Sequence, residues 1–399
     1  MRQQHLVIIG GGFAGFWSAM SAARQSRALA QHDELKITLI AKEGYHTIRP
    51  RLYATIEPDL GGMRIPLSDY LTPLNINLIV DEVASIVPEN RRISFIAGSS
   101  DIVYDALILA AGSQLNVTGI PGIEQTFNVD TFASASLLDR HLHKLSTTGF
   151  PTPSSRTFVV VGGGLAGLET VTALPQRLKT GTVSETEFNF FLIEKSPQLA
   201  ADYAAEAQYY IVNQLATAGI HLLLGTAVES IDNGKIALTQ GKYLDADTVI
   251  WTTGLRANPL TENFKGEHDQ LGRLDVDKFL RLPGQPMVFA AGDVAKALTD
   301  EHHYAVLSCQ HAIPQGKFAG HNAVNALFGQ ALLPYRQPRY TTCLDLGADN
   351  ALFTVGWERQ VKMVGAAAKA LKTQIVTQWI CPAPGVEETL KMSVPDVLQ

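Results

Sequence analysis

The chain carries the same glycine-rich pattern twice, and each copy directly follows a short apolar run. The copies are Gly10-Gly11-Gly12-Phe13-Ala14-Gly15 and Gly162-Gly163-Gly164-Leu165-Ala166-Gly167. The runs before them (6–9 and 158–161) predict buried parallel strands, and the residues after them (13–30 and 165–178) predict helices. In such a unit the first glycine permits a tight turn, the second admits a pyrophosphate and the third lets the helix approach the strand. Two copies 152 residues apart (162 − 10) therefore predict two dinucleotide sites on one chain.

A third motif lies late in the chain, where the apolar strand Met287 to Val294 ends in small residues and one carboxylate, Gly292-Asp293. Alone, Asp293 would indicate a helix cap. Behind two fingerprints it indicates an acceptor for ligand hydroxyl groups. With these three motifs the chain resembles the FAD-dependent pyridine nucleotide oxidoreductase superfamily, which has two dinucleotide-binding domains, and its motifs are most similar to those of type II NADH dehydrogenases.

The resemblance implies an α/β fold with two Rossmann-like dinucleotide-binding domains, for FAD and NAD(P)H, and a smaller C-terminal α+β domain. It implies that the first fingerprint and the late Gly-Asp hold FAD, and that the second fingerprint holds NAD(P)H. The strands that close the two domains match at 104–112 and 249–259. The residues expected to bind the cofactors are Gly10, Gly12, Phe13, Ala14, Gly15, Lys42, Arg49, Ala111, Gly112, Gly162, Gly164, Leu165, Gly167, Glu194, Gly254, Gly292 and Asp293.

Pattern breaks suggest that one domain is inserted into another. A segment rich in proline and serine, 149–155, precedes the second fingerprint. We expect a FAD-binding domain formed by 1–118 and 281–330, which includes a helix around 316–327. The inserted NAD(P)H-binding domain is 119–280. The C-terminal domain is 331–399, with alternating strands at 341–346 and 351–357.

Nucleotide specificity is expected at the end of the second strand of each unit, where an acidic residue takes the ribose hydroxyls. Glu194 holds that position in the second unit, after an inserted loop at 180–187, and it predicts a preference for NADH. Lys195 could instead meet a 2′-phosphate. In the first unit Ala41 stands where the acid is expected, so that Lys42, Glu43 or the backbone alone would serve the FAD ribose.

Composition narrows the class of protein. The net charge of −6 provides no basic field for nucleic acid. The residues before the first glycine turn include no apolar stretch of signal-peptide length, and no stretch reaches the length expected of a transmembrane helix. We expect a cytoplasmic enzyme, with membrane contact at most peripheral at the inner face, that works on a small-molecule acceptor, with a homodimer as one possible assembly. A segment at 364–380, with Leu371, Ile375 and Trp379 on one face and Lys369 and Lys372 on another, is expected to pack as a helix on the body of the protein.

The three cysteines, Cys309, Cys343 and Cys381, are isolated, without the closely spaced pair of disulfide reductases. Electrons are therefore expected to leave the flavin directly. A thiol relay would require Cys309 and Cys343 to meet in space.

The resemblance places two residues at the reaction. Glu169, after the second fingerprint, resembles the family glutamate between nicotinamide and flavin, and it also reads as a first-turn carboxylate stabilised by the helix dipole. Gln310 lies in a segment, 309–316, that resembles the border of the quinone site, although Pro314 replaces one of the two family glutamines. His311 is either a proton donor or a structural histidine. Arg49, beside Pro50, either serves FAD or belongs to an exposed loop.

The sequence thus predicts a FAD-dependent NAD(P)H:acceptor oxidoreductase, in which hydride passes from NADH to flavin N5 and electrons then pass to a quinone-like acceptor. Two other enzyme classes stay open: a flavin-dependent oxidase or monooxygenase of a small metabolite, and a reductase of an electron-transfer protein such as ferredoxin. A redox-sensing module that binds both nucleotides without turnover is the non-enzymatic alternative.

Overall fold

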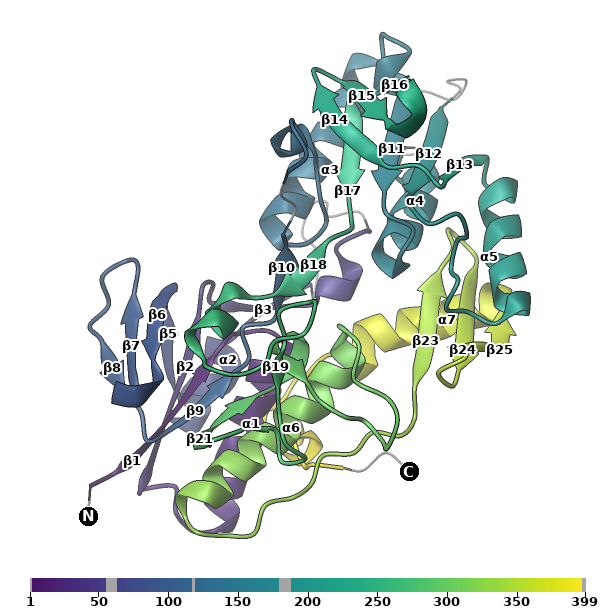
Figure 1. The fold of residues 1–399 in the computed structure, drawn as a ribbon. Coiled ribbons are helices and arrows are strands. Elements are labelled where there is room, and N and C mark those ends of the chain that lie inside the picture. The colour runs from purple at the N-terminus through teal and green to yellow at the C-terminus, as the bar shows by residue number, and fades with distance from the viewer. Residues whose placement is uncertain (1, 55–62, 117–118, 179–187, 397–399) are drawn as a thin grey trace.

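The computed structural model describes residues 2–54, 63–116, 119–178 and 188–396. Figure 1 shows two lobes, each with a central sheet flanked by helices, and a smaller antiparallel sheet with one long helix beside them. The two lobes follow the two fingerprints, so the duplicated sequence pattern corresponds to a duplicated architecture.

The first lobe is built on a six-stranded sheet with the order β20-β21-β9-β1-β2-β5. All of its strand pairs are parallel except the edge pair β20–β21. The main elements are β1 (Gln4–Ile9), α1 (Phe13–Ala28), β2 (Leu35–Ala41), β5 (Asn77–Val80), β9 (Ala106–Leu109), β20 (Arg281–Leu282), β21 (Gln285–Ala290) and α6 (Cys309–Leu327). The smaller elements are β3 (Tyr45–Thr47), β4 (Arg64–Pro66), α2 (Ser68–Leu71), β6 (Val83–Val87), β7 (Arg92–Phe95), β8 (Ile102–Val103), β19 (Leu274–Asp275) and β22 (Ala295–Lys296).

Helices α1 and α6 cross closely beside this sheet, and small residues make the approach possible. A Cβ atom at Gly316 would lie 2.3 Å from the Ala14 carbonyl oxygen, and one at Gly320 would lie 2.2 Å from that of Ser18. The Ser18 hydroxyl donates to the Gly316 carbonyl at 3.1 Å. Because the sheet, α6 and α8 all pack on α1, most of its residues are buried, including several serines, and no single apolar face stands out in its sequence.

The second lobe is built on a four-stranded parallel sheet with the order β13-β12-β11-β17. Its elements are α3 (Phe132–Thr148), β11 (Thr157–Val161), α4 (Leu165–Leu178), β12 (Asn189–Glu194), α5 (Ala205–Thr217), β13 (Ile220–Leu224), β14 (Val228–Asp232), β15 (Lys235–Leu238), β16 (Lys242–Asp245) and β17 (Thr248–Trp251). Strand β11 is buried along its whole length, as the unbroken apolar run predicts for a central parallel strand.

Two short strands connect the lobes. The chain leaves the first lobe through β10 (Ser113–Leu115) and returns through β18 (Leu255–Ala257), and these strands pair antiparallel. Both lie in the narrow region between the lobes in Figure 1. The second lobe is therefore attached through a two-stranded ribbon.

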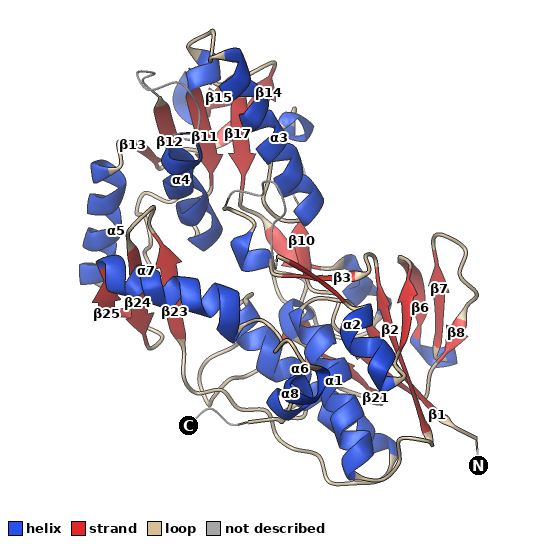
Figure 2. Ribbon diagram, turned by 180° about the vertical axis from the view of Figure 1, so that it is seen from behind, coloured by secondary structure: helices blue, strands red, loops and turns tan. Residues whose placement is uncertain are grey.

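The C-terminal part forms a three-stranded antiparallel sheet and then turns back to the first lobe. Its elements are β23 (Thr341–Asp345), β24 (Ala351–Val355), β25 (Gln360–Val364), α7 (Gly365–Gln374), a π-helical turn (Ile375–Trp379) and α8 (Val386–Met392). Figure 2 shows α7 and the π-helical turn running from this sheet toward the first lobe. Leu344 and Leu352 pack into the core of the second lobe, whereas Leu390 of α8 packs into the core of the first.

The predicted α/β fold, with two dinucleotide-type units and a C-terminal antiparallel sheet, is confirmed. Two expectations are corrected. The helix expected around Gly316 begins at Cys309, and the segment from Val364 to Ile380 is α-helical only to Gln374 before it widens into a π-helical turn. The inserted loop at 180–187 lies outside the described residues, and the domain boundaries stay a prediction. Within the part of the chain that the structure describes, no helix is long and apolar enough to cross a membrane.

Candidate functional site

The two fingerprint turns have the same local geometry. Gly10 and Gly162 adopt left-handed φ angles of 116° and 109°, where a side chain is strained. A Cβ atom at Gly15 would lie 1.8 Å from the Gly10 carbonyl oxygen, and one at Gly167 would lie 1.8 Å from that of Gly162. These four glycines are therefore required by the turn and by the helix that packs on it.

Gly12 and Gly164, the middle glycines of the two fingerprints, differ from these four. No neighbouring protein atom explains why these positions lack a side chain. A Cβ atom at Gly12 or Gly164 would meet no described atom within 4 Å. The helices that begin at Phe13 and Leu165 have no acidic residue in the first turn, and the N-cap of α1 has no side-chain hydrogen bond. Unpaired N–H groups and the positive end of the helix dipole attract phosphate. The open space at both turns therefore fits a pyrophosphate.

The late motif lies against the first fingerprint. Gly292 adopts a left-handed φ of 75°, and a Cβ atom there would lie 2.9 Å from the Cβ of Ala14. The Gly292 N–H donates to Gln315 Oε1 at 2.7 Å, which ties this turn to α6. The partly buried Asp293 carboxylate accepts a 2.6 Å hydrogen bond from the hydroxyl of Ser113. Burial raises the pKa of Asp293, whereas the Ser113 hydroxyl and then Arg49 oppose that rise.

The ends of the neighbouring strands complete the two turns in the same way. A Cβ atom at Gly10 would lie 3.2 Å from the Cα of Ala111, and one at Gly162 would lie 2.9 Å from the Cβ of Thr253. Gly112 and Gly254 follow these two residues with left-handed φ angles of 70° and 92°. The structure thus brings the strand-closing residues and the fingerprints together in each lobe.

Arg49 lies at the junction of the lobes and is not an exposed loop cation. Its guanidinium pairs with Asp130, donates to Ser113 Oγ at 3.0 Å and lies 4.0 Å from Asp293 Oδ2. Its side chain is about one-third exposed. Lys42, in contrast, is exposed, and its ammonium group pairs with the exposed Glu82 carboxylate at 2.7 Å on the surface of the first lobe.

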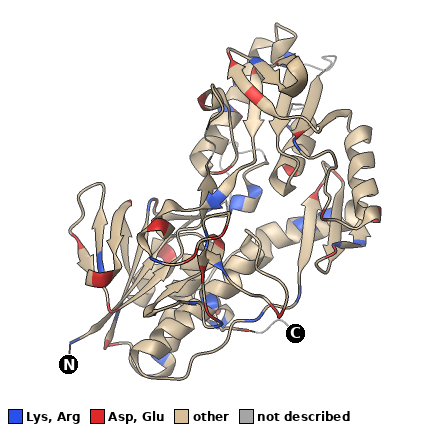
Figure 3. Cartoon of the chain, in the orientation of Figure 1, with Lys and Arg blue, Asp and Glu red and all other residues tan. Residues whose placement is uncertain are grey.

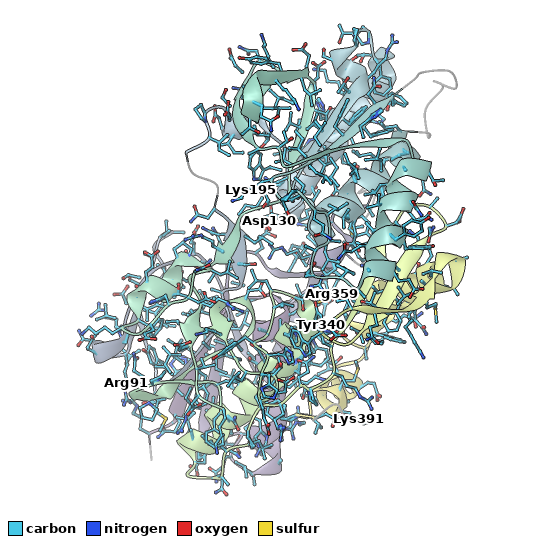
Figure 4. All side chains as sticks on the ribbon, turned by 45° about the vertical axis from the view of Figure 1, so that its right-hand side comes forward. Arg91, Asp130, Lys195, Tyr340, Arg359 and Lys391 are labelled. Carbon is cyan, nitrogen blue, oxygen red and sulfur yellow. The ribbon has the colours of Figure 1, made fainter. Side chains whose placement is uncertain are left out.

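Glu194 ends β12 beside the second fingerprint. One carboxylate oxygen accepts the Gly163 N–H and the other accepts the Ser196 N–H, each at 2.7 Å. Each oxygen retains a second lone pair for a ribose hydroxyl. Lys195 is exposed, and Figure 4 labels it in the second lobe, on the side that faces the first.

Glu169 lies in the second turn of α4, since the helix begins at Leu165, so the first-turn interpretation is wrong. Its Oε1 accepts hydrogen bonds from Lys372 Nζ at 2.6 Å and from the Asp345 N–H at 3.0 Å. Burial raises the pKa of Glu169 despite the opposing charge of Lys372. Burial alone would lower the pKa of Lys372, but the Glu169 carboxylate outweighs it and the pKa is raised.

The prediction that the segment after β25 packs on the body of the protein is confirmed, and its lysines make the contact. Lys372 is buried and Lys369 bonds both carboxylate oxygens of Asp345 at 2.7 Å, while Leu371 is only partly covered and Trp379 is 56% exposed. Figure 3 shows basic residues along α7, which runs beside the C-terminal sheet toward the first lobe. Val376 and Ile380 of the same segment are buried as well, so only part of its apolar surface, including Trp379, is turned outward.

Gln310 lies in the first turn of α6, and its environment follows from Pro314. Proline has no N–H, so the Gln310 carbonyl loses its helical partner and accepts instead from Gln337 Nε2 at 3.0 Å. The side-chain Oε1 accepts from Thr341 Oγ1 at 2.9 Å. The buried Nε2 has no hydrogen-bond partner among the described residues, so it can donate to a ligand.

His311 fits the structural interpretation. Its Nδ1 lies 3.0 Å from Gln337 Oε1, and burial lowers its pKa to about 4, so the imidazole is neutral at physiological pH. Its ring is nearly parallel to those of Tyr340 and Trp357, with centroids 5.7 and 6.0 Å away. Figure 4 shows Tyr340 beside Arg359, whose guanidinium donates to the Tyr340 hydroxyl at 3.1 Å. This cluster joins α6 to the C-terminal sheet.

All three cysteines are free thiols. Burial raises the pKa values of Cys309 and Cys343 to about 11, which keeps both protonated at neutral pH. A neutral buried thiol is a weak nucleophile.

Sequence reasoning missed Tyr53, Ser113, Asp130 and Asp345, and it missed the inward role of Lys372. One signal was available. Lys369 and Lys372 are three residues apart, so they share one face of a helix, and burial of that face would require acidic partners for both lysines. The other four lie in separate elements, and only the tertiary structure brings them to the site.

The chain is similar in sequence and in fold to several known proteins. The family described as pyridine nucleotide-disulphide oxidoreductase matches residues 4–316. An NADH dehydrogenase-like protein of Mycobacterium tuberculosis is 41% identical over 382 residues, which cover 94% of each chain. A type II NADH:quinone oxidoreductase of Staphylococcus saprophyticus is 24% identical over 392 residues, which cover 94% of this chain and 95% of the relative. The solved structure of NDH2 from Plasmodium falciparum has the same fold, with a TM-score of 0.78 at 16% identity over 98% of this chain and 97% of that one.

Proposed function

Since the chain belongs to the pyridine nucleotide-disulphide oxidoreductase family, we propose that it transfers electrons from NADH through FAD to a quinone-like small molecule. The protein is an NAD(P)H-dependent flavin oxidoreductase related to type II NADH:quinone oxidoreductases. FAD would supply hydride acceptance and two-electron transfer. The donor and the acceptor are the parts that we propose.

One arrangement carries the proposal for the acceptor: two polar groups from different elements meet on the same strand. Gln310 bonds Thr341 at the start of β23, and Lys372 donates to the carbonyl oxygen of Cys343 at 3.0 Å, two residues further along. Lys372 also bonds Glu169, on the helix that follows the second fingerprint. A buried amide donor and a buried ammonium group at neighbouring positions suit an acceptor with carbonyl oxygens.

Gln310→Leu tests the acceptor. The variant should be reduced by NADH at nearly the parent rate, whereas its reoxidation by a short-chain quinone should slow about tenfold, because a lost hydrogen bond to a ligand is worth about 1.5 kcal/mol. Stopped-flow absorbance at the flavin band, under anaerobic conditions, separates the two half-reactions. Thr341→Val is the matched control, since it removes the hydroxyl partner of Gln310 and keeps the amide. A parent protein that no quinone reoxidises would refute the acceptor assignment.

Asp293→Ala tests the FAD site. Ribityl hydroxyl groups bonded to a carboxylate are worth about 1.5–3 kcal/mol, so FAD affinity should fall about 10- to 150-fold. Flavin content after gel filtration and the Kd of re-added FAD measure the loss. Ser113→Ala keeps the carboxylate and removes only its hydroxyl donor, so it should retain more flavin. Full flavin occupancy in Asp293→Ala would exclude that residue from the site.

Glu194→Ala tests the choice of donor. The parent should have a higher kcat/KM with NADH than with NADPH, because a carboxylate accepts ribose hydroxyls and repels a 2′-phosphate. Without this carboxylate, the ratio of kcat/KM with NADH to kcat/KM with NADPH should fall about tenfold, which is equivalent to about 1.4 kcal/mol. Both oxygens also accept backbone N–H groups, and glutamine could replace only one of them, so thermal unfolding of Glu194→Ala provides the control for the fold. If the parent prefers NADPH, Lys195 becomes the leading determinant, and Lys195→Met should then reverse the preference.

A further inference from the structure

A second carboxylate–ammonium group adjoins the Glu169–Lys372 pair, and the proposed electron transfer leaves it without a role. Asp345 accepts two hydrogen bonds from Lys369 Nζ, both of 2.7 Å, and one of 2.7 Å from the hydroxyl of Tyr53. Tyr53 and Asp345 are buried, whereas the side chain of Lys369 is 26% exposed. The three groups therefore connect the solvent to the interior. They come from the first lobe, β23 and α7.

The inner end of this group meets the Glu169–Lys372 pair. The Asp345 N–H donates to Glu169 Oε1 at 3.0 Å, and Lys372 Nζ lies 5.9 Å from the centroid of the Tyr53 ring. Burial, followed by the charges of Glu169 and Asp345, raises the pKa of Tyr53 well above its usual value. The hydroxyl thus stays protonated, and it donates to Asp345 within the electrostatic influence of Glu169. The titratable or charged groups around Tyr53 and Asp345 are Glu169, Arg177, Cys343, Lys369 and Lys372.

The proposed reaction requires a proton from solvent. Electron and atom balance gives NADH + quinone + H⁺ → NAD⁺ + quinol, so each turnover consumes one proton besides the hydride. Glu169 and Lys372 each have side chains only 9% exposed, so this proton must pass other groups to reach them.

We propose that Lys369, Asp345 and Tyr53 form the proton uptake route to the Glu169–Lys372 pair. The inference rests on the proposed function, since it requires an acceptor that takes up protons with its electrons. Lys369 exchanges protons with solvent and passes one to Asp345. Tyr53 gives its hydroxyl proton toward Glu169 as Asp345 returns one, and rotation about the phenolic C–O bond restores the O–H bond to Asp345. No charge is left behind, because each group releases one proton for each proton it receives.

Half-reaction kinetics of two variants test the route. Tyr53→Phe removes only the hydroxyl, and Lys369→Met removes the group at the solvent end. In both, reoxidation by a short-chain quinone at high pH should slow at least about tenfold, within the range known for lost proton-transfer groups. Reduction by NADH, and reoxidation by ferricyanide, which takes electrons without protons, should stay within about twofold of the parent.

Matched controls separate the route from general effects of the substitutions. Tyr210→Phe removes another hydroxyl, which bonds Asn350 at 2.7 Å on the neighbouring α5, and Lys362→Met removes another lysine of the C-terminal sheet. Both should behave as the parent does. Small amines added to Lys369→Met should restore the quinone rate and flatten its pH profile, an effect that a merely structural lysine would not show.

A measurement on the resting protein, without NADH or acceptor, tests the coupling directly. The ultraviolet absorbance of tyrosinate follows the titration of Tyr53, and Tyr53→Phe identifies its signal. Glu169→Gln should bring the pKa of Tyr53 down, because after burial the charge of Glu169 is among the causes that raise it. A Tyr53 titration that is the same with and without the Glu169 carboxylate would overturn the proposal.

The results distinguish failure of the route from failure of the proposed function. A parent that no quinone reoxidises refutes the function. A parent that quinone reoxidises, with Tyr53→Phe equally fast at every pH, refutes the route alone. Equal slowing with quinone and ferricyanide also refutes it, because that pattern reports a disturbed electron path.

Discussion

Gly12→Ala protein will fold like the parent and lose its FAD. An added Cβ atom meets no described protein atom within 4 Å, and the φ of −76° at Gly12 is open to any residue. The cost to the fold is limited to a poorer N-cap, about 1 kcal/mol. A pyrophosphate on the N-terminus of α1 needs that space, so we expect FAD affinity to fall at least about 100-fold, or about 2.7 kcal/mol.

Gly15→Ala is the matched variant with the opposite outcome. Its Cβ atom would lie 1.8 Å from the Gly10 carbonyl oxygen, so α1 must move away from β1 in a densely packed core. Overpacking of this kind costs about 3 kcal/mol or more, and the melting temperature should fall clearly. Flavin absorbance relative to protein, together with thermal unfolding, separates the two variants. Full flavin in a stable Gly12→Ala protein would mean that the phosphates do not bind at this turn.

The second lobe offers the same test with the other nucleotide. Gly164→Ala should retain FAD and stability and weaken NADH binding, whereas Gly167→Ala should destabilise the lobe, since its Cβ would lie 1.8 Å from the Gly162 carbonyl oxygen. Agreement between the lobes would assign one role to each glycine.

Lys372→Met will destabilise the protein by about 3–5 kcal/mol at neutral pH. Lys372 and Glu169 are both buried, and removing one partner leaves an uncompensated charge in the interior. Glu169→Gln/Lys372→Met removes both charges, so it should recover much of the loss. A double-mutant cycle built from the midpoints of chemical unfolding measures the coupling.

The loss in Lys372→Met will depend on pH in a definite direction. Burial raises the pKa of Glu169 even with Lys372 present, and without that cation the pKa in the folded state rises further. The folded protein then binds a proton more readily than the unfolded chain does, so its stability falls as the pH rises through the pKa of the folded state and recovers toward acid. The variant should be closer to the parent near about pH 5 than near about pH 8. An equal loss of stability at both pH values would mean that Lys372→Met does not leave an ionised Glu169 carboxylate in the interior.

The sequence was informative where one residue type is required by local geometry. Gly10 and Gly162 adopt a left-handed backbone conformation that favours glycine. At Gly15 and Gly167 a side chain would collide with the carbonyl oxygen of Gly10 or Gly162. Each requirement thus involves residues within one six-residue motif. The apolar runs before the two motifs indicated buried parallel strands, and β1 and β11 each pair in parallel with a strand on either side. Together these features predict the fold class and the two turns.

Pairings across long separations could not be predicted in this way. Lys372 meets Glu169 over 203 positions, and Tyr53 meets Asp345 over 292. Each side chain has a reasonable local interpretation by itself: a lysine beside an apolar face, a tyrosine after an arginine-rich turn. The spacing of Lys369 and Lys372 shows that they share one face of α7, but it does not identify Asp345 and Glu169 as the groups with which they pair.

A ribosome makes the second lobe complete before the first. The strands and helices of the second lobe lie between Phe132 and Trp251, whereas β21, which pairs with β9, and α6, which packs on α1, emerge only with residues 285–327. Until then α1 exposes a face of small and aromatic side chains that has no partner in the nascent chain. The first lobe therefore completes its folding only after the second lobe has formed. The second lobe can then serve as the folded neighbour against which the remainder of the chain assembles.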